Sequence, residues 1–261
     1  MSVTLFSGFD VSTVTESGVK NLDTGGKIVW LQHGGDRSPI VLQTSVMRTP
    51  TGIREDRFKG DDKEDAAPGA VQKFAMELEL TDTVELAKLE AFDARILAMA
   101  SEAKGRWLSL KNYDRASLDN SYSNTVRVPR DKVTREVSDK WPVTMKVGVP
   151  KRNGAFQCEA WDLGQRPICI EDFMERSRNA QVTAIIRCTG VWTAAGRFGT
   201  TWKLQQLLVH ATKSVLNSFA FIGVENVGVE NPALASAPAA ARTITNNAVA
   251  GDDDEYLEDS D

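Results

Sequence analysis

The sequence has few of the residues that build metal and disulfide sites, and it has no long apolar run. Its 261 residues include three cysteines (Cys158, Cys169 and Cys188) and two histidines (His33 and His210). The cysteines are odd in number and widely spaced, and no zinc spacing occurs, so we expect reduced, buried thiols and no bound metal. No run approaches the roughly 18 apolar residues of a membrane span, and the first residues do not form a signal peptide. We therefore expect a soluble intracellular protein without a membrane partner.

Catalytic motifs are also missing. The sequence contains no Gly-rich phosphate loop and no nucleophile elbow, so we expect no cofactor and no enzymatic activity. Acidic pairs do occur at Asp61-Asp62 and Glu171-Asp172, and a metal-dependent nuclease would need such carboxylates to converge on Mg²⁺. Both pairs lie next to loop signals, which favours solvated surface positions. A nuclease stays as the less favoured rival hypothesis.

The sequence does have an uneven distribution of charge. The whole chain carries 31 Lys/Arg and 36 Asp/Glu, a net charge of -5, but residues 251–261 alone hold seven acidic side chains and no basic one. Residues 104–213 hold 19 Lys/Arg and 10 Asp/Glu, a net charge of +9. A segment of that charge favours anionic partners, most commonly nucleic acid. The acidic end has little to bury, so it is expected to stay solvated, and its simplest role is to keep the protein soluble.

Alternating polar and apolar residues predict strands at 28–32, 40–47, 71–80, 142–150, 155–161, 181–192 and 197–210. Turn signals at 34–36, at Asn153-Gly154 and at 193–196 predict that these strands pair as hairpins. Asp82 and Glu85 have the spacing of a capping box, and apolar residues then recur at three and four positions, which predicts one helix ending at Gly105. Residues 54–70 are predicted as an exposed loop, and residues 111–140 as a basic, polar excursion with little core of its own.

These elements predict a mainly β protein with an OB-fold-like five-stranded barrel and one capping α-helix. An all-β sandwich with an appended helix is the alternative. We expect an N-terminal extension at residues 1–24 and the barrel domain at 25–230. A flexible linker at 231–250 and a disordered acidic tail at 251–261 are expected to follow.

Outward basic residues on the predicted strands are interleaved with aromatic residues, which is typical of proteins that bind single strands. Cations follow the phosphates, and aromatic faces stack on bases without reading sequence. The predicted DNA-binding residues are Lys111, Tyr113, Arg127, Arg130, Lys146, Lys151, Arg152, Trp161, Arg187, Arg197 and Lys203. For each cation the alternative is an ordinary solvated charge, and for Trp161 it is burial. Trp30, Trp141, Trp192 and Trp202 are expected in the core, with Trp192 on the face of its strand opposite to Arg187.

Several segments carry a resemblance to a known family. They are Gln43-Thr44, residues 50–53, the predicted helix, residues 107–112, residues 141–147 and residues 196–205. Together they resemble the single-stranded DNA-binding proteins of nucleocytoplasmic large DNA viruses, which are similar to the acidic-tailed single-stranded DNA-binding proteins of short-tailed bacteriophages. The resemblance covers about residues 25–215 and the tail. It implies an OB-fold that coats single-stranded DNA in viral DNA replication, recombination and repair.

The resemblance also implies roles for the acidic tail. The tail would compete for the DNA groove and recruit the viral DNA polymerase and other replication proteins, at a replication site in the host cytoplasm or nucleus. A homodimer is implied as well. The implied partner-binding residues are Asp252, Asp253, Asp254, Glu255, Tyr256, Leu257, Glu258 and Asp259. The phage tails end in an aromatic residue, whereas Asp261 is last here, so Tyr256 would have to take that role. The rival is a virion or scaffold protein with a solubilising tail.

Overall fold

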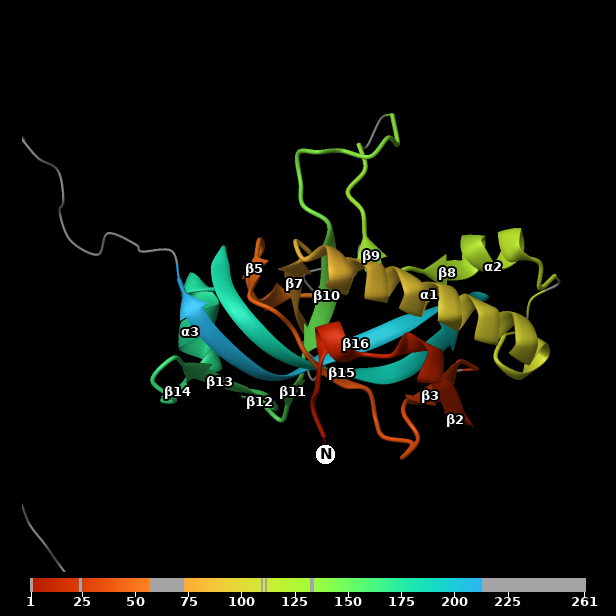
Figure 1. Cartoon of the computed structure of the whole chain (residues 1–261), viewed down its shortest axis with the longest axis horizontal. Coiled ribbons are helices and arrows are strands. Elements are labelled where there is room, and N and C mark those ends of the chain that lie inside the picture. Colours follow the sequence, from red (N-terminus) through yellow and green to blue (C-terminus); the bar gives the residue numbers. More distant parts are fainter. Residues whose placement is uncertain are drawn as a thin grey trace, which may run out of the picture. The chain divides into compact units, whose positions relative to one another are not determined.

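The computed structural model describes residues 2–23, 25–56, 73–108, 110, 112–131 and 134–212. Its fold is mainly β, as predicted (Figure 1). Several parts of the sequence-based predictions lie outside the described residues. They are Lys111, residues 57–70 of the predicted loop with the Asp61-Asp62 pair, residues 71–72 of the next predicted strand, residues 213–230 of the predicted barrel domain, and the linker and acidic tail from 231 to 261, which include all the implied partner-binding residues. They therefore stay predictions.

The elements follow one another along the chain in this order. The strands are β1 (Thr4–Leu5), β2 (Thr15–Asn21), β3 (Lys27–Gln32), β4 (Val41–Gln43), β5 (Met47–Thr49), β6 (Arg54–Glu55), β7 (Phe74–Glu79), β8 (Tyr122–Ser123), β9 (Val126–Arg127), β10 (Thr144–Val149), β11 (Lys151–Arg152), β12 (Ala155–Phe156), β13 (Glu159–Asp162), β14 (Pro167–Ile168), β15 (Ala180–Ala194) and β16 (Arg197–Ala211). The α-helices are α1 (Thr83–Ala103), α2 (Arg115–Ser121) and α3 (Ile170–Arg176), and the short 3-10 helices are η1 (Phe6–Gly8), η2 (Val11–Thr13) and η3 (Lys104–Arg106).

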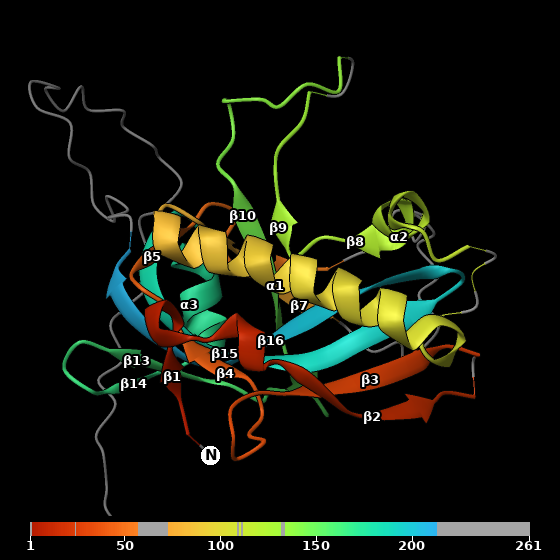
Figure 2. The same cartoon turned by 45° about the vertical axis from the view of Figure 1, so that its right-hand side comes forward.

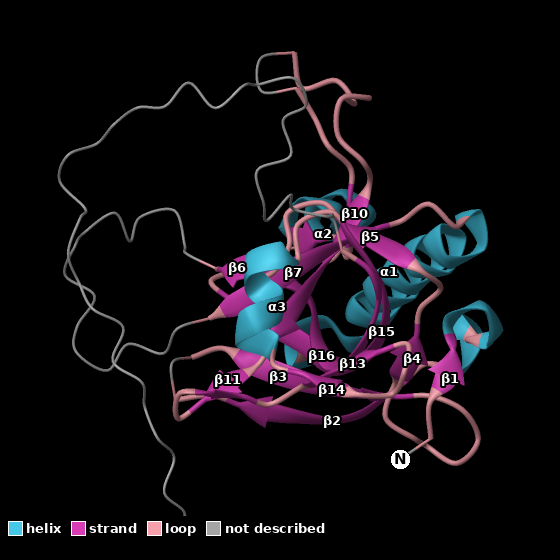
Figure 3. Cartoon of the chain, turned by 90° about the vertical axis from the view of Figure 1, so that its left-hand side faces the viewer, coloured by secondary structure: helices cyan, strands magenta, loops and turns pink. Residues whose placement is uncertain are grey.

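Strands β5, β7, β10, β15 and β16 of the described chain curl into a partly open barrel (Figure 3). The long strands β15 and β16 form the antiparallel hairpin predicted from the sequence. On one side β16 pairs in parallel with β10, and β10 pairs antiparallel with β7. On the other side β15 pairs with β5, which in turn contacts β7. A five-stranded, partly open barrel is the architecture of OB-folds, so the predicted fold class is confirmed.

Helix α1 packs along the barrel (Figure 2) and begins where the sequence predicts. The Asp82 carboxylate accepts hydrogen bonds from two N–H groups of the first turn, at 2.8 and 3.1 Å. The buried side of the helix includes Phe92, whose ring packs against that of Trp202 with the two centroids 5.5 Å apart. Glu85 does not complete a capping box. Its carboxylate instead accepts from Ser45 N and Oγ, at 2.8 and 3.0 Å, and thereby ties the helix to the chain between β4 and β5.

The N-terminal residues belong to the same packed core, which corrects the predicted extension at 1–24. Strand β1 pairs with β4, and β2 pairs with β3. Phe6, Phe9 and Val14 are at most 2% exposed. Lys88 donates to the carbonyl oxygen of Phe9 at 2.6 Å, and Arg95 donates to that of Val14 at 3.2 Å. This segment therefore packs against α1, and its apolar side chains cover part of the helix.

Two predicted hairpins differ from the structure. Residues 28–32 and 40–47 do not pair with each other, because the 15-residue strand β15 accommodates β3, β4 and β5 one after another along its edge. Asn153-Gly154 forms the predicted turn, with φ of 50° and 81°, but it joins β11 to β12 rather than β10 to a strand at 155–161. Within 155–161, the last residues enter β13, which pairs with β14 and β16.

Residues 112–127 contribute to the core, contrary to the prediction for 111–140. Helix α2 buries Leu118, and the strands after it bury Tyr122 and Val126. Residues 128–131 and 134–141, in contrast, project away from the barrel between β9 and β10 (Figures 1 and 2). The helix count also differs, since the described chain contains α2 and α3 besides α1.

The thiols follow the prediction in two of three cases. Cys158 and Cys188 are buried, and burial raises their pKa to about 11 and about 12. Cys169 is exposed, and its thiol donates to the Glu171 carboxylate at 3.1 Å. All three cysteines are free. Over the described ranges, no helix is long and apolar enough to cross a membrane.

Candidate nucleic-acid interface

A groove of about 640 Å³ lies where β7, β10 and β16 meet the chain before β9. Its position follows from the barrel, because β10 and β16 pair at only one position, Gly148 with Lys203, and then separate. The lining contains five cations, Lys73, Arg127, Lys146, Lys151 and Lys203, and one carboxylate, Asp56. Clefts lined mainly by one sign of charge concentrate ions of the opposite sign. The groove therefore suits a polyanion.

The cations in the groove come from different strands and differ in their partners. Lys146 of β10 pairs with Asp56 at 2.5 Å, and Arg127 of β9 pairs with Glu77 at 3.5 Å. Lys203 of β16 is exposed, and no carboxylate of the described residues pairs with it. The Lys146–Asp56 and Arg127–Glu77 pairs are partly solvated, so a phosphate can replace the carboxylate in each pair at a small cost in free energy.

Phe74, which lines the groove, packs against Phe156 beside the cation Lys151. The rings of Phe74 and Phe156 meet edge to face, with centroids 5.2 Å apart. The Lys151 ammonium lies 5.0 Å from the Phe74 centroid and 4.8 Å from the Phe156 centroid, within cation–π range. The two rings thus hold a positive charge against an apolar surface.

Trp192 lines the groove as well, although period-two alternation predicted that it lies in the core. The pairing of β15 with β16 shifts register between Cys188 and Gly190. Such a bulge reverses the phase of alternation, so Trp192 lies on the same face as Arg187 instead of the opposite one. The ring lies against Gly199, where an added Cβ would be 3.1 Å from Trp192 Cζ2.

Four of the predicted DNA-binding residues, Arg127, Lys146, Lys151 and Lys203, line this one groove. Arg187 is next to it, because it is the register partner of Lys203. Arg187 Nε is buried and has no hydrogen-bond partner within the described part of the chain. An anion at the groove edge would supply an acceptor on this side of the sheet.

The other predicted residues lie elsewhere. Arg130 is in the projecting segment, where its guanidinium donates to the carbonyl oxygen of Arg135 at 3.1 Å. Arg152 is exposed on β11, and Arg197 is exposed at the β15–β16 turn. Trp161 is half-buried on β13, paired with the part of β16 remote from the groove. Tyr113 donates its hydroxyl to Leu108 O and is partly buried against the core.

Sequence reasoning missed Lys73, Phe74 and Trp192. Lys73 lies outside residues 104–213, the basic segment that contains every predicted DNA-binding cation. Phe74 is half-buried on β7, within the predicted strand 71–80. The prediction that Trp30 and Trp141 lie in the core is also wrong, since Trp30 is 47% exposed and Trp141 is 68% exposed.

A buried carboxylate supports one wall of the groove. Asp93 of α1 accepts hydrogen bonds from Tyr122 Oη at 2.7 Å, Thr125 N at 2.9 Å and Thr125 Oγ1 at 2.6 Å. Thr125 Oγ1 is also 2.7 Å from Thr200 Oγ1 of β16. Burial raises the pKa of Asp93 above its ordinary value, against the lowering effect of these bonds. The network fixes the chain at 123–125 against β16.

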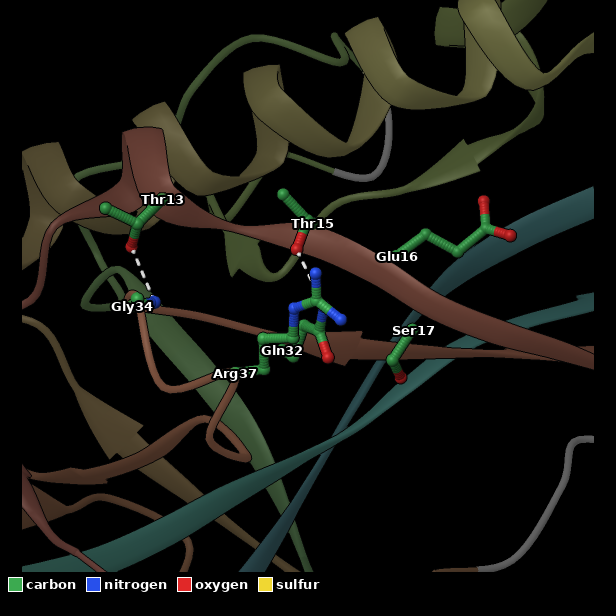
Figure 4. Close-up of a pocket in the computed structure, with 8 residues that line it drawn as sticks. Thr13, Thr15, Glu16, Ser17, Gln32, Gly34 and Arg37 are labelled. Atoms are coloured by element: carbon green, nitrogen blue, oxygen red, sulfur yellow. Dashed lines mark hydrogen bonds between the residues drawn. The ribbon is translucent and has the colours of Figure 1, made fainter.

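A second cavity, of about 520 Å³, lies along β2 and β3 (Figure 4). Thr13 Oγ1 accepts from Gly34 N at 3.1 Å, and Thr15 Oγ1 accepts from Gln32 Nε2 at 3.2 Å. Its lining is polar, with no aromatic ring. It therefore does not combine cations with stacking surfaces, as the larger groove does. Within the described residues, no three His, Cys, Asp or Glu side chains are grouped so that they could hold a metal ion.

Comparisons with known proteins found similarity only among solved structures. No protein-family model and no curated protein matches the chain. The chain is similar to the single-stranded DNA-binding protein from bacteriophage Enc34 in complex with ssDNA, with 10% identity and a TM-score of 0.44, over 76% of this chain and 96% of that chain. It is also similar to gp2.5, a single-stranded DNA-binding protein encoded by bacteriophage T7, with 11% identity and a TM-score of 0.40, over 71% of this chain and 97% of that chain.

Proposed function

We propose that this protein binds single-stranded DNA in the groove between β7, β10 and β16, without catalysis and with little preference for sequence. The observation that carries the proposal is that one groove holds five cations together with Phe74 and Trp192. Cations neutralise phosphates, and flat rings stack on the faces of unpaired bases. Every base has such a face, so this mode of binding tolerates any sequence.

The position of the groove in the barrel supports the same function. In chain order β7 and β10 are the second and third barrel strands, after β5. In OB-folds the face of these two strands commonly binds oligonucleotides. This support is an analogy between folds, whereas the charges and rings in the groove are properties of this chain.

The finer parts of the proposal concern biology. As the sequence resemblance implies, the protein would act as a viral protein in DNA replication, recombination and repair, as a homodimer. Its acidic tail would compete with DNA for the groove and recruit DNA polymerase and other replication proteins. The charge of the tail supports this, because seven carboxylates tethered to the same chain are opposite in sign to the cations of the groove.

A fluorescence titration tests the proposal. We expect single-stranded oligo-dT to change the emission of the six tryptophans, and duplex DNA of the same length to bind more weakly. Lys203→Glu should weaken binding and lower the slope of log affinity against log salt by about one unit, because one phosphate contact is lost. Arg178→Glu is the matched control, since Arg178 is exposed and does not line the groove.

Three results would contradict the proposal. Equal affinity for single and double strands would remove the role of stacking. Equal effects of Lys203→Glu and Arg178→Glu would place binding outside the groove. No binding at all would favour a virion or scaffold role, and cleavage of labelled single strands with Mg²⁺ or Mn²⁺ would favour a nuclease.

A further inference from the structure

Trp30 is a large aromatic side chain on the outer surface of the sheet. Its neighbours in β3, Val29 and Leu31, are buried at 0% and 7% exposure, whereas Trp30 is 47% exposed. Because side chains alternate along a strand, Trp30 points away from the core. An indole held in this way is available to a partner with flat apolar faces.

The positions beside Trp30 in both neighbouring strands are glycines. Gly18 of β2 is its register partner, and Gly190 of β15 lies opposite, one residue from the pair Val191–Val29. A Cβ on Gly18 would lie 3.5 Å from Trp30 Cε3, and one on Gly190 would lie 3.4 Å from Trp30 Cα and 2.3 Å from the carbonyl oxygen of Val29. These strands therefore place no side chain beside the indole that could cover it.

The outer face is continuous from Trp30 to the groove. Trp192, which lines the groove, is the register partner of Ile28, two residues before Trp30 on the same face of β3. Such diagonal positions on adjacent strands are about 7–8 Å apart. Thr201, which also lines the groove, is the register partner of Gly190. Trp192, at the edge of the groove, thus connects the groove to the surface around Trp30.

A cation lies at the far edge of this surface. Lys20 of β2 is the register partner of Ile28 and is exposed. Paired residues of antiparallel strands lie on the same face, so Lys20, Ile28 and Trp192 form one row across three strands. The row repeats the combination of cation and aromatic ring found in the groove.

We infer that a bound single strand leaves the groove over Trp192 and continues to Trp30, where a base stacks on the indole and Lys20 faces the backbone. This inference rests on the proposed function and extends the binding surface from the barrel to β2 and β3. The ligand is an unpaired nucleotide, because bases stacked within a duplex offer no free face to a side chain.

Trp30→Leu tests the inference in the full chain, because leucine keeps apolar cover over Gly18 but removes the flat ring. We expect a loss of affinity of about 5- to 150-fold for an oligo-dT of about 15 nucleotides. An oligo-dT of about 5 nucleotides, which the groove alone would hold, should change by less than about twofold. Trp30→Phe should restore most of the affinity for the longer oligonucleotide. Trp141→Leu removes another exposed tryptophan, one outside this surface, and should change neither affinity.

The results separate three cases. A loss that is equal for both lengths, or one that follows a lowered unfolding temperature and is not restored by Trp30→Phe, would mean that Trp30 only covers glycines, and would overturn the inference. Unchanged affinity at both lengths would also overturn it, and Lys203→Glu would then still weaken both if the groove binds DNA. Absence of binding by the unsubstituted protein at both lengths would reject the proposed function itself.

Discussion

At the scale of single residues, the groove depends on Asp93, which is only 7% exposed. The carboxylate satisfies Tyr122 Oη and both the N–H and the hydroxyl of Thr125. No sequence motif marks this role, because the partners are about 30 residues away and meet Asp93 only in the fold. A buried donor without its acceptor loses the bond and cannot regain it from water.

Asp93→Asn should therefore destabilise the protein by about 1–3 kcal/mol, because an amide offers one acceptor oxygen and brings a donor group against existing donors. Urea unfolding at about pH 7 measures the change. Asp139→Asn is the control, since Asp139 is exposed. Equal stabilities of the two variants would show that the network around Asp93 contributes nothing.

The pH dependence of stability should also change in Asp93→Asn. Burial raises the pKa of Asp93 in the folded protein above 3.8, so between 3.8 and the raised value the folded state binds more protons than the unfolded state. Stability from this group is then fully present below the unfolded pKa and is lost as the pH rises through the folded pKa. The unfolding free energy of the wild type minus that of the variant should be larger at about pH 4 than at about pH 7. The opposite trend would mean that the hydrogen bonds outweigh burial.

At the scale of elements, the N-terminal segment and α1 depend on each other. Phe9 is 2% exposed. The centroid of its ring lies 6.2 Å from that of Phe92 and 5.5 Å from that of His33. Lys88 of α1 donates to the carbonyl oxygen of the same residue. The segment therefore fixes the helix on which Asp93 and Phe92 are placed.

Phe9→Ala should cost about 3–5 kcal/mol of stability, the usual range for removing a buried phenyl ring. Thermal and urea unfolding measure this loss. Leu5→Ala, in the same segment but 60% exposed, is the control and should change stability little. A Phe9→Ala variant as stable as Leu5→Ala would show that residues 1–24 are, after all, an extension outside the core.

Strand β15 shows why side-chain orientation is harder to predict than the strand itself. The strand and its turn with β16 are evident in the sequence, and both are confirmed, whereas the predicted alternation holds only as far as Cys188. The bulge between Cys188 and Gly190 is not evident, because it depends on pairing with two neighbouring strands. It moves Trp192 from the predicted core to the groove, so the residue most relevant to stacking was assigned to the wrong face.

At the scale of the whole molecule, the charges of the body and of the tail oppose each other. Residues 104–213 carry a net charge of +9, and residues 251–261 carry seven acidic side chains. If the tail competes for the groove, truncation after Ala250 should tighten binding of single-stranded oligo-dT at low salt. The gain should shrink as salt screens the competition. A titration of both proteins over a range of salt concentrations measures it, and unchanged affinity at low salt would reject autoinhibition.

The sequence by itself determined the mainly β class, the position and N-cap of α1, the β15–β16 hairpin and the net positive charge of residues 104–213. These features follow from local periodicity, capping chemistry and composition, which need no knowledge of distant contacts. Only the tertiary structure decided which cations share one groove, that Trp192 and Trp30 face outward, and that the N-terminal residues complete the core. The physical reason is that bulges, shared strand edges and buried hydrogen bonds depend on residues that are far apart in the chain and adjacent only after folding.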